Sequence, residues 1–175
     1  MPVVSFLIQQ FLIKSKVVKS KTSSKGLKLL QQSLSKLQVS GVEVGYFNGE
    51  IHEGSEMTLA ALMTLLEYGS NDGSIPARFP FTQVSAIETP SKEPNVRKKL
   101  KQGLSNTVRT GDANNLLELL GKHYVDAVGS IFGDTTRLLS NSSFTQALKG
   151  KDSPLIENGE LLRKLTYRKI KKERK

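Results

Sequence analysis

The chain has 175 residues, with 26 Lys and Arg against 16 Asp and Glu, which gives a formal net charge of +10 at pH 7. This length fits a single domain with short extensions. The absence of cysteine excludes disulfides, thiolate nucleophiles and cysteine-ligated metal sites, and two histidines, His52 and His123, are too few for a multi-histidine metal site within one chain.

The N-terminal residues 1–13 are apolar enough that a signal peptide or a membrane anchor must be considered. The first Lys comes only at position 14, and Gln9 and Gln10 interrupt the apolar run, so we expect neither a secretory signal nor a spanning helix. The β-branched and aromatic content instead predicts an extended strand or a packing arm over residues 1–22.

A helix and a hairpin are expected next. Leucines spaced by three, four and three residues predict a helix from Ser23 to Gln38. Residues 42–47 alternate as a strand does, and Asn48-Gly49 predicts a tight hairpin turn that returns the chain through residues 50–52.

Glycines and prolines mark the expected ends of the elements in the middle of the chain. Ser55 is the expected cap of a second helix, which should end at Gly69. The two prolines within residues 75–81 predict an extended segment there. A third helix is expected to begin near Pro94 and to be the most basic helix of the chain.

The C-terminal third is expected to be mostly helical. Asp112 is the predicted cap of a long helix that continues to about Phe132, and a shorter helical piece is expected from Thr135 to Leu139. Residues 154–159 predict a turn, and residues 160–170 predict a turn of helix or a bend that enters a final strand.

These elements predict an α+β fold, in which a small antiparallel sheet packs against several helices. The predicted organisation is an N-terminal basic arm at residues 1–22, a single domain at residues 23–168 and a basic C-terminal tail at residues 169–175. There are too few strands in alternation with helices for a parallel, doubly wound sheet.

No residue pattern indicates a catalytic site. The Ser and Thr residues lack a nucleophile-elbow signature, and neither His52 nor His123 stands in a motif. Glu50, Glu53 and Glu56 have the chemistry for acid–base work or for a divalent cation, but a solvated acidic rim at a helix start is the favoured interpretation. We therefore predict a protein that is not an enzyme and that has no cofactor or metal.

Positive charge is concentrated at the two ends of the chain. Residues 1–40 hold seven Lys and no acidic residue, whereas residues 41–70 hold five Glu and no Lys or Arg. Clustered cations attract nucleic-acid phosphates, or they dock on acidic surfaces of a partner or of a second copy, and the sequence leaves both open. Without aromatic residues among the cations, contact with DNA would be non-specific. The residues expected to face DNA are Arg97, Lys98, Lys99, Lys101, Lys171 and Lys172.

Three segments carry a resemblance to a known family. The first is residues 44–49, followed by a helix whose end reads Leu-Glu-Tyr-Gly at residues 66–69. The second is Ile-Pro-Ala-Arg-Phe-Pro-Phe at residues 75–81. The third is Pro-Leu-Ile-Glu-Asn-Gly-Glu-Leu at residues 154–161. In this order they resemble the tailed-bacteriophage head–tail joining and tail-completion family of minor virion proteins, over about residues 42–168. Two departures stand out, because Phe79 splits the family's Arg-Pro-Phe run and Glu157-Asn158-Gly159 replaces an Asp-Thr-Gly turn.

The resemblance implies a structural viral protein of the virion, located at the neck or tail end and assembled in the host cytoplasm. It implies a ring of identical copies, expected to be a hexamer, through which DNA passes without any membrane contact. Expected neighbours are a tail terminator, a tail tube or a head-side connector, and the resemblance does not separate tail completion from tail termination or head-side joining. The alternative is a basic protein that binds nucleic acid non-specifically.

Most candidate interface residues follow from the same segments, and Phe6 and Ile8 come from the N-terminal arm. Pro76 and Pro80 would hold Phe79 and Phe81 extended, either to fill the core or to grip a neighbouring subunit. Arg78 would then pair with an acidic residue of the next copy or with Glu67 in its own chain. The predicted interface set is Glu67, Tyr68, Arg78, Phe79, Phe81, Phe6 and Ile8.

Overall fold

The computed structural model describes residues 4–7, 24–87 and 94–171. Contacts divide the chain into two compact units. Unit 1 comprises Met1–Val4, Val44–Glu88 and His123–Tyr167, and unit 2 comprises Ser5–Glu43, Thr89–Lys122 and Arg168–Lys175. The predicted arm is described only at residues 4–7, and the predicted tail only at residues 169–171, which end a strand.

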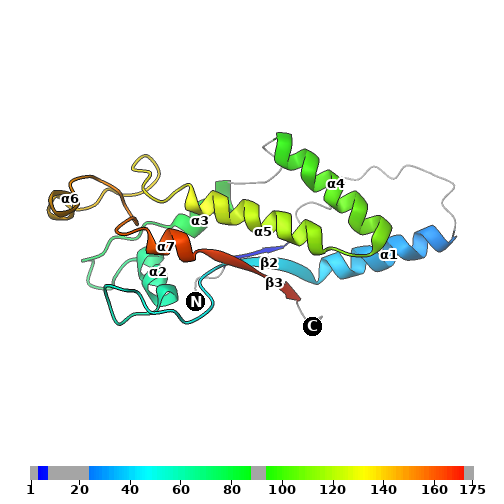
Figure 1. The fold of residues 1–175 in the computed structure, drawn as a ribbon, viewed down its shortest axis with the longest axis horizontal. Coiled ribbons are helices and arrows are strands. Elements are labelled where there is room, and N and C mark those ends of the chain that lie inside the picture. Colours follow the sequence, from blue (N-terminus) through cyan, green and yellow to red (C-terminus); the bar gives the residue numbers. More distant parts are fainter. Residues whose placement is uncertain (1–3, 8–23, 88–93, 172–175) are drawn as a thin grey trace. The chain divides into compact units, whose positions relative to one another are not determined.

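The fold is α+β, as the sequence predicts (Figure 1). Three strands form one small sheet in the order β1-β2-β3, and β2 and β3 run antiparallel. The strands are β1 (Val4–Leu7), β2 (Ser40–Gly45) and β3 (Thr166–Lys171). The helices are α1 (Ser24–Gln38), α2 (Leu59–Tyr68), α3 (Pro80–Ile87), α4 (Pro94–Thr110), α5 (Asn114–Gly129), α6 (Ser143–Lys149) and α7 (Glu160–Lys164).

Unit 1 is built around apolar side chains from α2, α3, the second half of α5 and the C-terminal segment. Met63 of α2, Val84 of α3 and Val128 of α5 are fully buried. Burial of such side chains stabilises each by about 1.5–3 kcal/mol relative to exposure. Further core members are Leu59, Phe81, Tyr124, Ile131, Phe132, Leu138, Leu155, Leu161 and Leu165.

Unit 2 contains the two long helices α1 and α4, which pack against each other. Leu37 of α1 and Leu100 of α4 are buried, and the Ser33 hydroxyl of α1 donates to the Val108 carbonyl at 3.4 Å. On the sheet, Arg168 Nη2 of β3 lies 2.8 Å from Glu43 Oε2 of β2. Both long helices begin within one residue of their predicted starts. The sequence pattern therefore locates helices with long apolar stripes well.

Two predicted local structures between β2 and α3 are wrong. Asn48-Gly49 does not make a hairpin, because only Gly49 of the pair has a positive φ (67°), and residue 51 pairs instead in an isolated bridge with Thr58. The α2 helix is capped not by Ser55 but by Thr58, whose hydroxyl accepts from Ala61 N–H at 3.2 Å.

Short helices also differ from the prediction. Pro80 does not belong to an extended segment but opens α3, where its missing N–H and fixed φ suit the first helical position. Residues 135–139 form turns and bends rather than a helical piece, and α6 lies in a stretch for which no element was predicted. The Ser142 hydroxyl accepts from Thr145 N–H at 3.2 Å and so caps α6.

Candidate functional site

A buried carboxylate joins α2 to α3 in unit 1. Glu67, in the last turn of α2, is 1% exposed. Its Oε2 accepts from Phe81 N–H at 3.0 Å, and its Oε1 accepts from Thr82 N–H at 2.9 Å and from the Thr82 hydroxyl at 2.6 Å. The first amides of a helix have no partner within that helix and carry the positive end of its dipole. Glu67 therefore caps α3 from outside the helix.

The segment between these helices folds back on the end of α2. Gly69 ends α2 with φ 79°, and a Cβ at that position would lie 2.8 Å from the Ile75 carbonyl oxygen and 2.9 Å from Ala77 N. Arg78 N–H donates to the Leu66 carbonyl at 3.0 Å. Only glycine, which lacks a Cβ, tolerates both this φ and this approach.

Arg78 connects the same segment to residues 139–152. Its side chain is 8% exposed, with Nε donating to the Leu139 carbonyl and Nη2 donating to Asn141 Oδ1, each at 3.3 Å. Asp152 accepts from Asn141 N–H at 3.0 Å. Burial lowers the pKa of Arg78, and the negative charge of Asp152 opposes that shift. The predicted pairing of Arg78 with Glu67 is wrong, because the Glu67 carboxylate is already occupied by the amides of α3.

A second polar network ties the loop after β2 to α7. His52 Nε2 lies 3.5 Å from Glu160 Oε2, which also accepts from Glu53 N–H at 3.2 Å. Asn158 donates through Nδ2 to Glu53 Oε2 at 3.0 Å, and its Oδ1 accepts from Glu160 N–H at 2.9 Å. The Tyr46 hydroxyl donates to the Leu161 carbonyl at 2.7 Å, and burial raises the pKa of Tyr46. His52 is thus a loop residue whose ring lies against a buried carboxylate.

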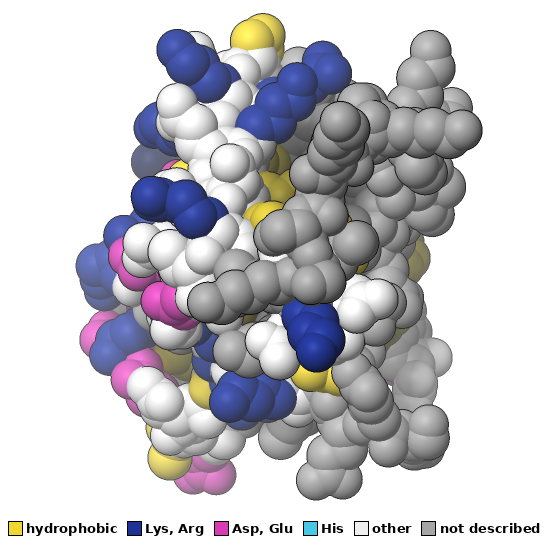
Figure 2. All heavy atoms as spheres, turned by 90° about the vertical axis from the view of Figure 1, so that its right-hand side faces the viewer, with side chains coloured by type: hydrophobic (Ala, Val, Ile, Leu, Met, Phe, Trp, Pro, Cys, Tyr) yellow, Lys and Arg dark blue, Asp and Glu magenta, His cyan; other side chains and the backbone are white. Residues whose placement is uncertain are grey.

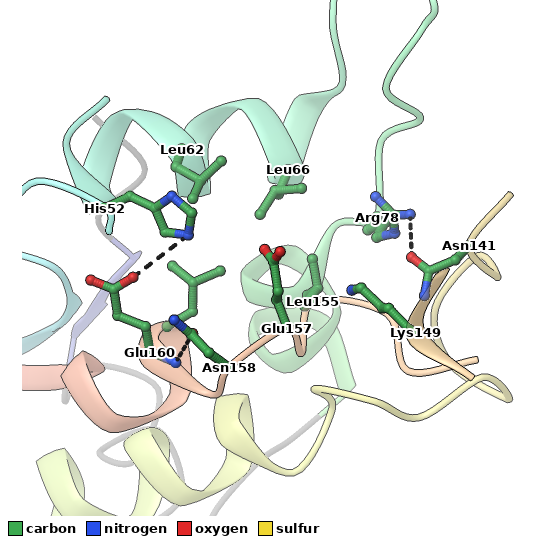
Figure 3. Close-up of a pocket in the computed structure, with 11 residues that line it drawn as sticks. His52, Leu62, Leu66, Arg78, Asn141, Lys149, Leu155, Glu157, Asn158 and Glu160 are labelled. Carbon is green, nitrogen blue, oxygen red and sulfur yellow. Dashed lines mark hydrogen bonds and ion pairs between the residues drawn. The ribbon is translucent and has the colours of Figure 1, made fainter. Parts of the chain in front are cut away.

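A pocket of about 170 Å³ lies between the two networks (Figure 3). Arg78, Asn141 and Lys149 line one side, and His52 and Glu160 line the other. Lys149 Nζ donates to the Ile156 carbonyl at 2.9 Å, so this cation already has a partner within the chain. The polar groups around the pocket therefore serve first to hold the surrounding segments together.

The acidic residues near the start of α2 are dispersed. Glu50 Oε2 makes an ion pair with Lys164 Nζ at 3.0 Å, and Glu53 bonds Asn158. Glu56 is exposed. Over residues 4–7, 24–87 and 94–171, no group of three or more His, Asp or Glu side chains is placed to hold a metal ion.

The structure separates the predicted interface residues into buried and exposed ones. Glu67 and Phe81 are each 1% exposed and Arg78 is 8% exposed, so these three belong to the interior of unit 1. Tyr68 and Phe79 are 62% and 43% exposed and remain open to a neighbour. Phe6 lies in β1, but its side chain and the whole of Ile8 fall outside the described residues.

The predicted DNA-facing cations lie mainly on α4 in unit 2. Arg97, Lys98, Lys99 and Lys101 are all exposed, and α4 contains no acidic residue. Lys171 is exposed at the end of β3, whereas Lys172 is outside the described residues. Figure 2 shows Lys and Arg side chains spread along one side of the described surface.

Sequence reasoning missed two exposed apolar groups. Phe144 and Leu148 of α6 are 72% and 73% exposed, and Ile51 and Met57, in the loop before α2, are 63% and 37% exposed. A signal for the first pair is present in the sequence, because Phe144 and Leu148 are four residues apart and follow the helix-capping Ser142.

No family model, curated protein or solved structure matches the chain. In the described part of the chain, no helix is long and apolar enough to cross a membrane. Within unit 1, the three segments that carry the family resemblance are linked to the same core: residues 66–69 bond residues 75–81, and residues 154–161 bond Tyr46 and Gly133.

Proposed function

We propose that this chain is a structural virion protein of a tailed bacteriophage, a neck or tail-completion subunit that forms a ring with copies of itself. The observation that carries the proposal is the convergence of the three resembling segments in unit 1. Gly69, Arg78 and Leu161, one from each segment, all take part in close contacts that fasten that segment to the rest of the unit.

The use of the buried charges supports a structural role. Glu67 caps α3, Arg78 fastens residues 139–141, and Glu160 fastens residues 52–53. Each of these charged groups stabilises a connection between distant segments, as a rigid assembly subunit requires, and a buried charge with its partners removed costs several kcal/mol. We propose that the protein is not an enzyme and that its function depends on the surface that this framework presents.

The proposed location is the neck or the tail end of the virion, reached by assembly in the host cytoplasm. The proposed ring is a hexamer, and its proposed neighbours are a tail terminator, a tail tube or a head-side connector. Tyr68 and Phe79 are the exposed members of the originally predicted interface set and are proposed to contact a neighbour.

The proposal is tested by the composition of purified particles. Mass spectrometry of gradient-purified virions from the phage that encodes the chain should detect it at a few copies per particle, far below the major capsid protein. Cryo-electron microscopy of the same particles should place unit 1 at the joint between head and tail. Intact, infective particles that contain no copy of the chain would overturn the proposal.

One observation favours a second candidate function, non-specific binding of nucleic acid. The four exposed cations of α4, Arg97, Lys98, Lys99 and Lys101, lie on a helix without acidic residues, and such a cluster releases counterions when it meets phosphates. Within the proposed ring, the same cluster would contact DNA in transit without reading its sequence.

A further inference from the structure

Helix α6 has an apolar face that the described residues leave exposed. Phe144 and Leu148 lie one turn apart on the same side of the helix and are 72% and 73% exposed, and none of the α6 residues is buried. A helix of seven residues is marginal without packing of its apolar face. In Figure 1, loops connect α6 to the rest of unit 1, and α6 lies apart from α2, α3 and α7, the other short helices of this unit.

Basic residues flank this face in the sequence. Residues 137–151 contain three basic residues, Arg137, Lys149 and Lys151, and no Asp or Glu. Lys151 is exposed, and Lys149 is half-buried. We call the surface made of Phe144, Leu148, Lys149 and Lys151 the α6 patch.

A surface of opposite charge lies before α2. Residues 50–57, here called the acidic loop, contain three Glu and no Lys or Arg, and Ile51 and Met57 are exposed among them. Backbone hydrogen bonds hold the loop in shape, since His52 N–H donates to the Met57 carbonyl at 2.9 Å and Leu59 N–H to the Glu50 carbonyl at 2.8 Å. The acidic loop therefore presents its apolar side chains from a fixed backbone.

We propose that the α6 patch of one copy docks on the acidic loop of a second copy. Each surface has exposed apolar side chains beside an exposed charge, and the two charges are opposite, Lys151 on the α6 patch and Glu56 on the acidic loop. Neither surface covers the other within one chain, because Phe144, Leu148 and Ile51 each remain more than 60% exposed. Complementary charge of this kind guides association and fixes which surfaces meet.

The charges also disfavour a contact between two copies of the same surface. Two α6 patches facing each other would oppose Lys with Lys, and two acidic loops would oppose Glu with Glu. The proposed contact joins two unlike surfaces, and where it repeats from copy to copy it is head-to-tail, a geometry that closes into a ring or continues into a filament. The inference rests on the proposed function for the closure of the ring, whereas the contact between two copies follows from the surfaces themselves.

The absence of cysteine from the chain allows a direct test. The full-length variant Leu148→Cys/Met57→Cys, treated with a short bismaleimide cross-linker, should give a ladder of covalent dimers and larger oligomers. Leu148→Cys alone and Met57→Cys alone should stay monomeric after the same treatment, and a 1:1 mixture of the two should yield heterodimers only. Dimers from Leu148→Cys alone would show a contact between two α6 patches and would overturn the inference.

A charge exchange provides the second test. Glu56→Lys and Lys151→Glu should each weaken self-association by about tenfold, which corresponds to 1.4 kcal/mol. The double variant Glu56→Lys/Lys151→Glu should restore most of that loss, as measured by sedimentation velocity. Lys122→Glu, which changes an exposed Lys on α5 outside both surfaces, is the matched control and should leave association unchanged.

The outcomes separate this inference from the proposed function. A wild-type chain that stays monomeric at all concentrations by sedimentation velocity, with a Leu148→Cys/Met57→Cys variant that does not cross-link, would overturn the docking contact, while presence of the chain in purified virions would still support the virion role. Head-to-tail oligomers as predicted, together with virions that lack the chain, would leave the contact standing and overturn the virion role.

Discussion

Thr82 donates both its backbone N–H and its hydroxyl to a single oxygen of Glu67, at 2.9 and 2.6 Å. The other Glu67 oxygen accepts from Phe81 N–H, so one buried carboxylate serves two amides and one hydroxyl at the start of α3. Glu67 stands 15 residues before Thr82 in the chain, in a different helix. The orientation of α3 relative to α2 therefore depends on this side chain.

Replacing Glu67 should destabilise unit 1 strongly. Glu67→Ala leaves two buried or half-buried amides without their acceptor and should cost about 3 kcal/mol in the free energy of unfolding. Glu67→Gln keeps one acceptor oxygen and should cost less. The measurement is urea denaturation followed by circular dichroism, with Glu56→Ala, at an exposed position, as the control that should change stability by less than about 0.5 kcal/mol. Equal stability of Glu67→Ala and Glu56→Ala would contradict the capping role.

Gly69 and Gly73 provide a matched pair of substitutions. Both have a left-handed φ, 79° and 73°, but a Cβ at Gly69 would meet backbone atoms at 2.8 and 2.9 Å, whereas a Cβ at Gly73 would meet nothing within 4 Å. Gly73→Ala should cost about 1 kcal/mol from φ alone. Gly69→Ala should cost about 3 kcal/mol, because the chain must also move away from α2. Thermal unfolding of both variants measures the difference, and equal melting temperatures would rule out the close approach.

The turn at residues 70–74 should contribute pH-dependent stability. Hydrogen bonds from the Ser70 hydroxyl and from the N–H and hydroxyl of Ser74 lower the pKa of Asp72 to about 2. Because the folded pKa lies below the unfolded value of about 3.9, the stabilisation is present above pH 4 and is lost as the pH falls towards 2.

The substitution Asp72→Asn removes the negative charge of this turn and so tests its contribution to stability. The variant should be less stable than the wild type at pH 7, and the two stabilities should converge between pH 4 and pH 2, as measured by denaturation at a series of pH values. Asp126→Asn on α5, an exposed position, provides the control curve. A stability difference that stays constant down to pH 2 would show that the Asp72 charge does not contribute.

The α4 cations should control any binding of DNA. Binding of a duplex to the wild type should weaken steeply with salt, and changing Arg97, Lys98, Lys99 and Lys101 together to Gln should lower the slope of log K against log salt by up to about 4. Fluorescence anisotropy with two duplexes of unrelated sequence measures both the slope and the lack of specificity. An unchanged slope would assign the contact to other residues, and a strong sequence preference would contradict non-specific binding.

The sequence predicts the long helices well and the short elements poorly, for a physical reason. The apolar stripes of α1, α4 and α5 repeat over three or more turns, so their period is clear and their starts fall within two residues of the prediction. α3 and α6 have eight and seven residues, too few for a period to stand out, and the position of Pro80 at the start of α3 makes it look like a helix breaker.

The polar networks of unit 1 were harder to predict than its helices. The importance of Arg78 was recognised from its segment, but its partners Leu139 and Asn141 are more than 60 residues away and have no periodic signature. The same holds for His52 and Glu160, whose proximity depends on how the loop before α2 meets α7. Sequence spacing predicts which residues share a face of one element, and it does not predict which elements meet.

The central claim is that the chain completes the junction between phage head and tail. Its most direct test is deletion of the gene from the phage that encodes it, followed by electron microscopy and infectivity assays of the lysate. The account predicts filled heads and separate tails that do not join, with infectivity restored when the purified wild-type chain is added to the extract. Normal, infective tailed particles in the absence of the chain would contradict the account.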